Sequence, residues 1–293
     1  MRQSLDKRLF AVTGYIILIL ISLCCVLPFL LIFVGSLTKE SEVVRNGYRL
    51  FPGEWSFAAY ELVFKAPWEI VRAVSVSVSL VVVGTAIGVF ITAMTAYVLQ
   101  RKDVRYRNIA AFYIYLTSVF SGGLVPYYII MVDYLHMKDM YLALLLPLLL
   151  NVFNILVMKS FYASIPEAIV ESGKMDGAGE LKIFIALVLP IAKPGLATVG
   201  LFIALAYWND WFNAMLFISD ERLYPLQFYL YNILNQANAL ANMSAVSGIP
   251  SVELPKETVK LAMTVLAVAP IMLVYPLAQR YIVGGITIGA VKG

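Results

Sequence analysis

The stretch ESGKMDGAGELKIFIALVLP, Glu171–Pro190, decides the fold of this chain, because it places charges and glycines between two long apolar runs. Its charged residues after Glu171 are Lys174, Asp176, Glu180 and Lys182. Charged side chains are costly in hydrocarbon and avoid it unless they are buried in protein. We therefore expect this stretch to lie in water on one face of a membrane, with an apolar run crossing the membrane on each side of it.

The composition agrees with a membrane protein. Of the 293 residues, 61% are hydrophobic and only 14% are charged, and the mean hydropathy is +0.83. Soluble domains carry roughly 25% charged residues. The chain has room for about six spans of about 20 apolar residues each, with loops. The net charge of +4 says little about nucleic acid in such a chain, and we expect no nucleic-acid partner.

Six apolar stretches are long enough to cross a bilayer as helices, which satisfy their own backbone groups in lipid. They cover residues 9–37, 71–99, 109–132, 140–161, 196–218 and 259–283. We predict an all-α polytopic membrane protein with a single transmembrane domain over residues 1–293. Small residues at helical spacing in the second stretch predict close helix packing there; they are Gly84, Gly88, Ala93 and Ala96.

The distribution of Lys and Arg predicts the orientation. With the N-terminus inside, the inner segments carry more basic than acidic residues, whereas the outer segments carry slightly more acidic ones. The positive-inside rule then places both termini and the segment 164–190 in the cytoplasm. The outer segments are 38–70 and 219–258.

The segment 164–190 has the features of a short, stiff helical hairpin. Ser164 and Glu167 have the spacing of a capping box around Pro166. A narrow stripe at helical spacing follows, formed by Ile165, Ala168, Ile169, Ser172 and Met175. We expect Gly177, at φ > 0, and Gly179 to end this helix. A second helix is predicted over 180–189, ended by Pro190 and the Lys193-Pro194-Gly195 sequence.

The two long outer segments have different characters. The first contains Trp55, Phe57, Tyr60, Phe64 and Trp68, a spacing that suits a helix lying at the membrane interface. The second is polar and too long for a simple turn, so we expect it to contact a partner.

Catalytic and metal-binding motifs are missing from the sequence. It contains one histidine, His136, and lacks HExxH, G-x-S-x-G and P-loop patterns. We therefore expect no catalytic residue, no cofactor site and no metal site in this chain, and no enzyme activity. The missing P-loop also means that we expect no ATP binding through that motif in this chain.

One acidic residue, Asp210, lies deep in a predicted span. An intramembrane carboxylate faces protein or a water-filled cavity and is a functional candidate. Its neighbours add indole and amide groups suited to sugar surfaces and hydroxyls. The candidates for a substrate path are Tyr207, Trp208, Asn209, Asp210, Trp211 and Asn213. The alternative is a polar packing cluster with interfacial tryptophans.

The chain resembles permease subunits of bacterial carbohydrate importers of the ATP-binding-cassette class, over almost its whole length. Residues Glu171–Pro190 match the family's docking motif, a Glu-Ala-Ala triplet followed at fixed spacing by Gly and Leu-Pro. Ser172 and Gly173 depart from the two alanines. The cluster at 208–210, the tail at 279–286 and the ending at 289–293 resemble the maltose-permease G-subunit type. Phe120-Ser121-Gly122-Gly123-Leu124-Val125-Pro126-Tyr127 is similar to polysaccharide-oligomer permeases.

This resemblance implies the type I importer fold in the bacterial cytoplasmic membrane. It also implies four kinds of partner: a second permease, two ATPase subunits that bind ATP and Mg, an extracellular binding protein and a carbohydrate substrate. The implied ATPase-coupling residues are Glu167, Glu171, Asp176, Gly177, Ala178, Leu189 and Pro190. The implied tail contact to the ATPases spans 286–293, with Lys292 and Gly293, and the loop within 244–255 would enter the binding protein.

Other readings remain open beside this one. An importer permease for an amino acid, peptide or phosphate would share the docking motif. A secondary transporter would need several intramembrane charges, where this chain has one deep acid, Asp210. A membrane enzyme would need a catalytic constellation.

Overall fold

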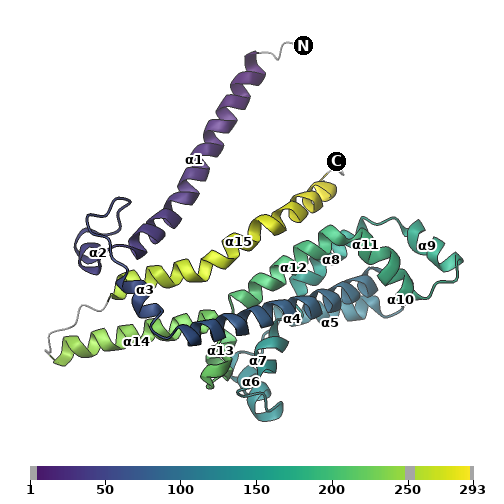
Figure 1. Cartoon of the computed structure of the whole chain (residues 1–293). Helices are drawn as coiled ribbons and strands as arrows, with labels where there is room; N and C mark the ends of the chain where they lie inside the picture. Colours follow the sequence, from purple (N-terminus) through teal and green to yellow (C-terminus); the bar gives the residue numbers. More distant parts are fainter. Residues whose placement is uncertain (1–4, 248–254, 291–293) are drawn as a thin grey trace. The chain divides into compact units, whose positions relative to one another are not determined.

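The computed structural model describes residues 5–247 and 255–290, and these residues are almost entirely helical (Figure 1). Within them the one β-type pairing is an isolated bridge between Thr38 and Trp55. The chain divides into two units, which are described separately. Unit 1 comprises Met1–Pro67 and Leu230–Ala269, and unit 2 comprises Trp68–Tyr229 and Pro270–Gly293. The prediction of an all-helical protein is confirmed for the described residues.

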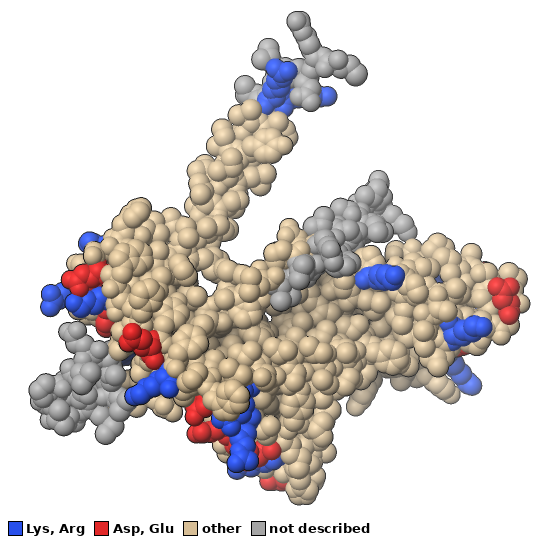
Figure 2. Space-filling model, viewed as in Figure 1, with Lys and Arg blue, Asp and Glu red and all other residues tan. Residues whose placement is uncertain are grey.

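Unit 1 begins with α1, Leu5–Ser36, whose apolar side chains are exposed from Phe10 to Leu30, whereas its last turns are partly buried. Figure 2 shows its shaft without a charged side chain, with basic residues only near the N-terminal end. The stretch Phe10–Ser36 is long and apolar enough to cross a membrane. An uncharged helix of this length, exposed on all sides in the isolated chain, fits the predicted first span.

The segment after α1 differs from the interfacial helix predicted for it. It forms two short helices, α2 (Glu40–Asn46) and α3 (Ala58–Val63). Trp55 pairs with Thr38 in the isolated bridge instead of lying on a helix. The prediction failed because Pro52 and Gly53 interrupt the segment and Pro67 starts the next helix, so no long helix can form.

The last two helices are α14, Leu226–Ser247, and α15, Lys256–Ala290. Within unit 1, the Glu40 carboxylate accepts hydrogen bonds of 2.8 Å from the Glu257 N–H, 2.9 Å from the Thr258 N–H and 2.8 Å from the Thr258 hydroxyl. It thus satisfies donors that the first turn of a helix leaves unpaired. The outer segment 219–258 contains the 3₁₀ turn η4 (Glu221–Leu223) and the whole of α14. Residues 248–254 of the predicted partner loop lie outside the described residues.

Unit 2 is organised along α4, Pro67–Gln100, a helix of 34 residues. Helices α8 (Val152–Ala163) and α12 (Lys193–Trp208) pack against it, and α5 (Arg107–Val119) contacts α8 (Figure 1). The small residues of α4 permit close packing, as predicted. A Cβ at Gly84 would lie 2.3 Å from the ring of Tyr207, and one at Gly88 would lie 3.1 Å from the Leu149 carbonyl oxygen.

Two predicted spans are bent rather than straight. The stretch 109–132 divides into α5 and the pair α6 (Leu124–Ile129) with the π-helix η1 (Ile130–Tyr134), bent by 112°. Gly123, at φ +87°, allows this bend. The stretch 140–161 divides into α7 (Tyr141–Leu145), the 3₁₀ turn η2 (Leu146–Leu148) and α8, bent by 46°.

The predicted span 196–218 is also interrupted. Helix α12 ends at Trp208, and α13 runs from Phe212 to Phe217. The prediction of one continuous helix is therefore wrong for all three stretches. Among the described residues, two unbroken helices are long and apolar enough to cross a membrane, or up to five candidates if each bent pair counts as one span. The number of spans stays a prediction.

Cysteine labelling tests the predicted orientation. With Cys24 and Cys25, which are both exposed, replaced by serine, a single cysteine at exposed Lys182 should react with a membrane-impermeant maleimide only from the cytoplasmic side. A single cysteine at exposed Gln236 should react only from the outside. Both orientations follow from the positive-inside rule. The reverse labelling pattern would contradict the orientation.

Candidate functional site

The segment predicted as a hairpin consists of two helical arms joined by a tight turn. The first arm is α9, Glu167–Met175. The second comprises α10 (Glu180–Ile183), the π-helix η3 (Phe184–Val188) and α11 (Leu189–Ile191). Gly177 lies between the arms with φ +74°, which confirms the positive φ predicted for it. Gly179 immediately precedes α10.

The turn is a Schellman motif. The Gly177 N–H donates to the Lys174 carbonyl and the Ala178 N–H donates to the Gly173 carbonyl, both at 3.0 Å. These two bonds satisfy carbonyl groups that would otherwise be unpaired at the end of α9. Because the central residue of this motif must adopt the left-handed conformation, the glycine is required by the backbone and not by crowding. A Cβ at Gly177 would meet no atom within 4 Å.

The two arms pack closely at Gly173, the one buried residue of α9. A Cβ there would lie 2.9 Å from Leu187 Cδ1 and 3.1 Å from Ile183 Cγ1. Gly173 is one of the positions where the sequence departs from the alanines of the family motif. The structure gives this departure a physical reason, since the missing Cβ lets α9 approach the second arm.

The residues of the predicted stripe are mostly exposed, with Ala168, Ser172 and Met175 open and Ile165 and Ile169 half-buried. Two details of the predicted hairpin are wrong. The Ser164 hydroxyl donates to the Phe161 carbonyl at the end of α8 (2.7 Å), so it does not cap α9, whose preceding residue Pro166 makes no side-chain cap. Pro190 does not end the second arm, which continues to Ile191; Lys193 begins α12 after a bend of 85°.

Four charged side chains form a closed ring of ion pairs, which we call the ion-pair ring: Arg101, Asp103, Lys174 and Glu180. Arg101 donates from Nε to Asp103 at 2.9 Å and from Nη1 to Glu180 at 3.0 Å. Lys174 Nζ lies 2.8 Å from an oxygen of Asp103 and 3.1 Å from an oxygen of Glu180. The ring thus joins the loop after α4 to the end of α9 and the start of α10, on both sides of the Gly177 turn.

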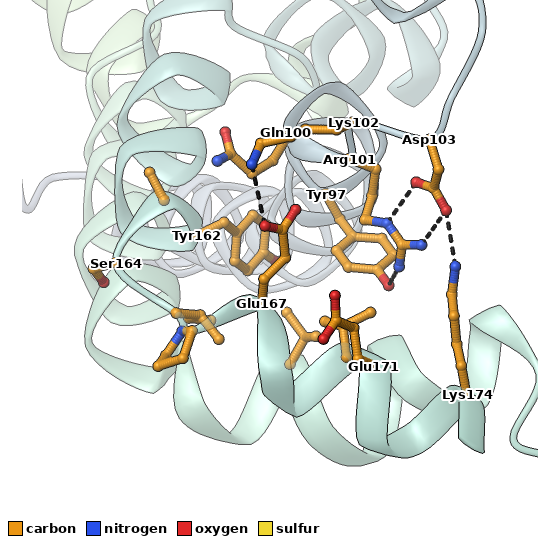
Figure 3. Close-up of a pocket in the computed structure, with 15 residues that line it drawn as sticks. Tyr97, Gln100, Arg101, Lys102, Asp103, Tyr162, Ser164, Glu167, Glu171 and Lys174 are labelled. Atoms are coloured by element: carbon orange, nitrogen blue, oxygen red, sulfur yellow. Dashed lines mark hydrogen bonds and ion pairs between the residues drawn. The ribbon is translucent and has the colours of Figure 1, made fainter. Parts of the chain in front are cut away.

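The guanidinium of Arg101 is the centre of this ring. Its side chain is only 14% exposed, whereas those of Asp103, Glu180 and Lys174 are 50%, 57% and 42% exposed. Arg101 also donates to the Tyr97 hydroxyl at 2.8 Å (Figure 3). Beside the ring, Lys102 Nζ lies 3.1 Å from the Glu167 carboxylate. A guanidinium can serve several acceptors at once because its donors form a rigid planar fork.

The ring holds its carboxylates in the charged form. Hydrogen bonds from Arg101 and then Lys174 lower the pKa of Asp103 well below its usual range. Burial works to raise the pKa of Glu180, but Lys174 and Arg101 lower it on balance. The hydrogen bond to Asp103 raises the pKa of Lys174. A lowered carboxylate pKa adds stability at neutral pH that is lost as the pH falls through the folded-state pKa, so acid should open the ring.

A cavity of about 570 Å³ lies between α9 and the end of α4 (Figure 3). Its aromatic wall includes Tyr97 and Tyr162, whose rings meet edge to face with centroids 6.1 Å apart. Its charged lining includes Arg101, Glu167 and Glu171. The predicted coupling residues Glu171 and Asp176 are exposed, so both are accessible to a partner.

The second candidate site, around Asp210, lies where α12 stops. The Asp210 carboxylate accepts from the Asn213 N–H at 3.2 Å and from Asn213 Nδ2 at 2.8 Å. Tyr127, from the segment 120–127, donates its hydroxyl to Asn213 Oδ1 at 2.8 Å. The structure therefore brings Asp210 and Asn213 together, and it adds Tyr127, which the sequence did not indicate.

The remaining path candidates divide between packing and exposed positions. Tyr207 is 1% exposed; its ring packs on Gly84 and its hydroxyl donates to the Leu145 carbonyl at 2.6 Å. Trp208 is also buried, whereas Asn209 and Trp211 are exposed and Asp210 is half-buried. Helix α12 ends at Trp208, so the candidates after it lie beyond the helix that carries Tyr207 and Trp208.

Comparison with known proteins decides the family. Residues 84–288 match the family described as binding-protein-dependent transport system inner membrane component. The chain belongs to this family. It is accordingly a multi-pass permease subunit of the cell membrane, in a transport system of the ABC class that depends on a binding protein.

Relatives cover this permease from end to end. It is 37% identical over 295 residues to protein LplC of Bacillus subtilis, covering 100% of this chain and 98% of the relative. It is 37% identical over 291 residues to the polygalacturonan/rhamnogalacturonan transport system permease YtcP of the same organism, covering 99% and 100%. A chain of a bacterial ABC transporter involved in the import of the acidic polysaccharide alginate shares the fold, with a TM-score of 0.78, 28% identity and coverage of 96% and 99%.

Some residues of this permease were missed by sequence reasoning, and others cannot be placed. Arg101, Lys102 and Asp103 were not among the predicted site residues, because nothing in the local sequence links them to residues 65 to 79 positions away. The family motif begins after them and gave no hint. The predicted tail contacts Lys292 and Gly293 lie outside the described residues.

Proposed function

We propose that this chain is the permease subunit of an importer that carries an oligosaccharide and docks an ATPase through the hairpin from Glu167 to Ile191. The observation that carries the docking role is the hairpin itself, with its Schellman turn at Gly177 and the exposed face of its first arm. The oligosaccharide follows from YtcP and the alginate importer, whose names specify polysaccharide substrates. Both relatives match nearly the whole chain.

The exposed face of α9 is the proposed contact with the ATPase. It presents Glu171 and Asp176 beside Met175, which is 83% exposed. An exposed apolar side chain flanked by carboxylates suits a groove with an apolar floor and a basic rim. Gly177, Ala178, Leu189 and Pro190 shape the hairpin rather than contact the partner in this proposal, and Glu167 is held by Lys102.

The proposed assembly has five polypeptides, including this permease. A second permease completes the path, two ATPase subunits bind ATP and Mg, and a binding protein delivers the sugar. In this proposal both termini and the hairpin are cytoplasmic, and six spans cross the membrane. The tail from 286 to 293, with Lys292 and Gly293, reaches the ATPases, and the segment 244–255 contacts the binding protein.

The proposed path is lined by the accessible residues at the break between α12 and α13. Asn209 and Asp210 offer hydrogen-bonding groups, and Trp211, which is 39% exposed, offers an indole face. Such a set suits the hydroxyls and C–H faces of a sugar. Tyr207, Trp208 and Asn213 position this set from the buried side in our proposal.

Mutations of the accessible path residues and of the buried residues behind them should have different effects. We expect Trp211→Ala and Asp210→Asn to lower sugar uptake by about tenfold while membrane abundance stays unchanged, because they remove a stacking face and a charged acceptor from the path. Trp208→Ala should instead lower abundance, because Trp208 is 8% exposed and its removal leaves a cavity. Uptake per folded complex and abundance by immunoblot check both. Met215→Ala, at an exposed position of α13, is the control.

Equal losses of abundance in the Trp211 and Trp208 variants would contradict the path and favour a packing cluster. A smaller loss of uptake in Asp210→Asn than in Met215→Ala would also contradict the path. The proposal is therefore tested by whether the exposed-residue variants lose uptake and the buried-residue variant loses abundance.

The experiment that tests the function as a whole is reconstitution. The permease, its partner permease and its ATPases, placed in liposomes, should hydrolyse ATP faster when a binding protein loaded with an oligosaccharide is added. A binding protein loaded with an amino acid or peptide tests the non-sugar alternative. Uptake driven by a proton or sodium gradient without ATP would instead indicate a secondary transporter.

A further inference from the structure

The ion-pair ring lies between the proposed docking hairpin and the end of α4. Helix α4 in turn extends from the ring to the proposed path. Helix α4 ends at Gln100, next to Arg101. From that end, 17 residues of helix lead to Gly84, a distance of about 25 Å at 1.5 Å per residue. Gly84 packs directly on Tyr207, three residues before Asp210. One uninterrupted helix thus runs from the hairpin to the neighbourhood of the path.

The contact between α4 and the hairpin is polar at its rim and aromatic beneath. Tyr97, one turn before Arg101, lies with its ring centroid 5.1 Å from that of Phe184 in the second arm. Its hydroxyl receives the Arg101 hydrogen bond and lies 3.3 Å from Glu180. Arg101 therefore links three groups, the Tyr97 hydroxyl, Asp103 and Glu180, that come from both sides of the contact.

The geometry makes the ring a restraint on rotation of the hairpin. A single ion pair would let the hairpin pivot about one point. The closed ring instead holds α9 through Lys174 and α10 through Glu180, so both arms are fixed to the same loop. Partly exposed single pairs contribute little to stability, but a network with a two-point guanidinium contact also fixes orientation.

We propose that Arg101 is a positioning residue that makes the hairpin and α4 move as one body, so that ATPase motion reaches the path through α4. This inference rests on the proposed docking function and adds the element that carries the motion. In it, Arg101 touches neither the ATPase nor the sugar. Its role is to prevent the hairpin from tilting against α4 when the docked partner moves.

The test is Arg101→Gln in the reconstituted complex, with Arg105→Gln as the matched control. Arg105 is an exposed arginine of the same loop, and its guanidinium lies over the Tyr106 ring, outside the ion-pair ring. We expect Arg101→Gln to capture the ATPases as well as wild type and to keep basal hydrolysis. The stimulation of hydrolysis by loaded binding protein should fall at least about fivefold, as for loss of a typical coupling free energy. Arg101→Lys keeps the positive charge but not the planar fork of donors, so its stimulation of hydrolysis should lie between those of wild type and Arg101→Gln.

Glu180→Gln is the second variant, because it opens the ring from the hairpin side at a more exposed position. Its effect and that of Arg101→Gln should be strongly non-additive in the double variant, as expected for members of one network. A purely structural role would lower abundance and leave the stimulation ratio of the surviving complexes unchanged, and that result would overturn the proposal. So would additive effects, or a loss of ATPase capture that accounts for the lost hydrolysis.

Failure of the proposed function would look different. If the wild-type complex itself shows no stimulation by any loaded binding protein, the docking function is wrong and this inference falls with it. If wild type is stimulated and Arg101→Gln is stimulated equally, the docking function stands and only the role of Arg101 is wrong.

Discussion

Valine at Gly177 should abolish most of the ATP hydrolysis that a loaded binding protein stimulates, while the membrane spans remain inserted. The φ of +74° at this position lies in the left-handed region, where a β-branched side chain is strained. Strain of this kind costs about 1–3 kcal/mol. The turn would relieve it by rearranging, and the Gly177 and Ala178 hydrogen bonds that fix the angle between the two arms would be lost. A loss of about 2 kcal/mol in docking corresponds to more than about tenfold weaker ATPase binding.

Two controls separate backbone strain from side-chain bulk at the turn. Gly179→Ala should be nearly silent, because Gly179 has φ −68° and an added Cβ would meet nothing within 4 Å. Gly177→Asn should retain most of the activity, because asparagine tolerates the left-handed conformation. Capture of the ATPase by the tagged permease and stimulated hydrolysis are the measurements. Normal capture and hydrolysis in Gly177→Val would contradict the docking role of the hairpin.

Valine at Gly84 should remove most of the folded protein from the membrane. A Cβ there would lie 2.3 Å from two carbons of the Tyr207 ring, which is 1% exposed and is held by its hydroxyl bond to the Leu145 carbonyl. The ring cannot swing away without breaking that bond and displacing its neighbours. Overpacking of this kind typically costs 1–3 kcal/mol and can cost more. Abundance in the membrane and the thermal transition of the detergent-solubilised protein should both fall.

Gly200→Ala is the control for this effect. It adds a Cβ to another helical glycine of unit 2, at an ordinary contact distance of 3.4 Å from Val89 Cγ2. It should leave abundance and the transition temperature close to wild type. A Gly84→Val protein as abundant and as stable as Gly200→Ala would show that α4 and α12 are not packed as the structure has them.

The parts of the site that were predictable from sequence are those encoded by local backbone chemistry. The spacing of Gly177 after the apolar-polar segment predicted a positive φ and a helix end, because few residues other than glycine adopt that conformation easily. The small residues of α4 predicted close packing for a similar reason. Both predictions depend only on a residue's own backbone or on its missing side chain, so they can be made without knowing the fold.

Predictions failed where two local signals compete for the same group. The Ser164 hydroxyl could cap α9 or donate to the preceding helix, and in the structure it donates to the Phe161 carbonyl. Pro190 was read as a helix breaker, yet it lies within the second arm, directly after the π-helix η3, and the chain bends only after Ile191, before Lys193. The choice depends on where each helix ends in space, which the local sequence does not specify.

The ion-pair ring could not be found by spacing at all. Arg101 and Glu180 are separated by 79 positions, and their encounter depends on the angle between α4 and the hairpin. The same holds for Tyr127 and Asn213, separated by 86 positions. A charged loop residue has many possible partners in the chain, and only the fold selects among them.

The 112° bend between α5 and α6 restricts which surfaces of this protein can touch lipid. At such a break, the last carbonyls of α5 and the first N–H groups of α6 have no partner within their own helix. Hydrocarbon offers none either, and an unpaired peptide group there costs several kcal/mol. The Gly122-Gly123 break, if it lies at membrane depth, must therefore face protein or water, whereas the unbroken and apolar α1 can be surrounded by acyl chains on every side. Whether a segment can face lipid thus depends on an unbroken helical backbone as much as on apolar side chains.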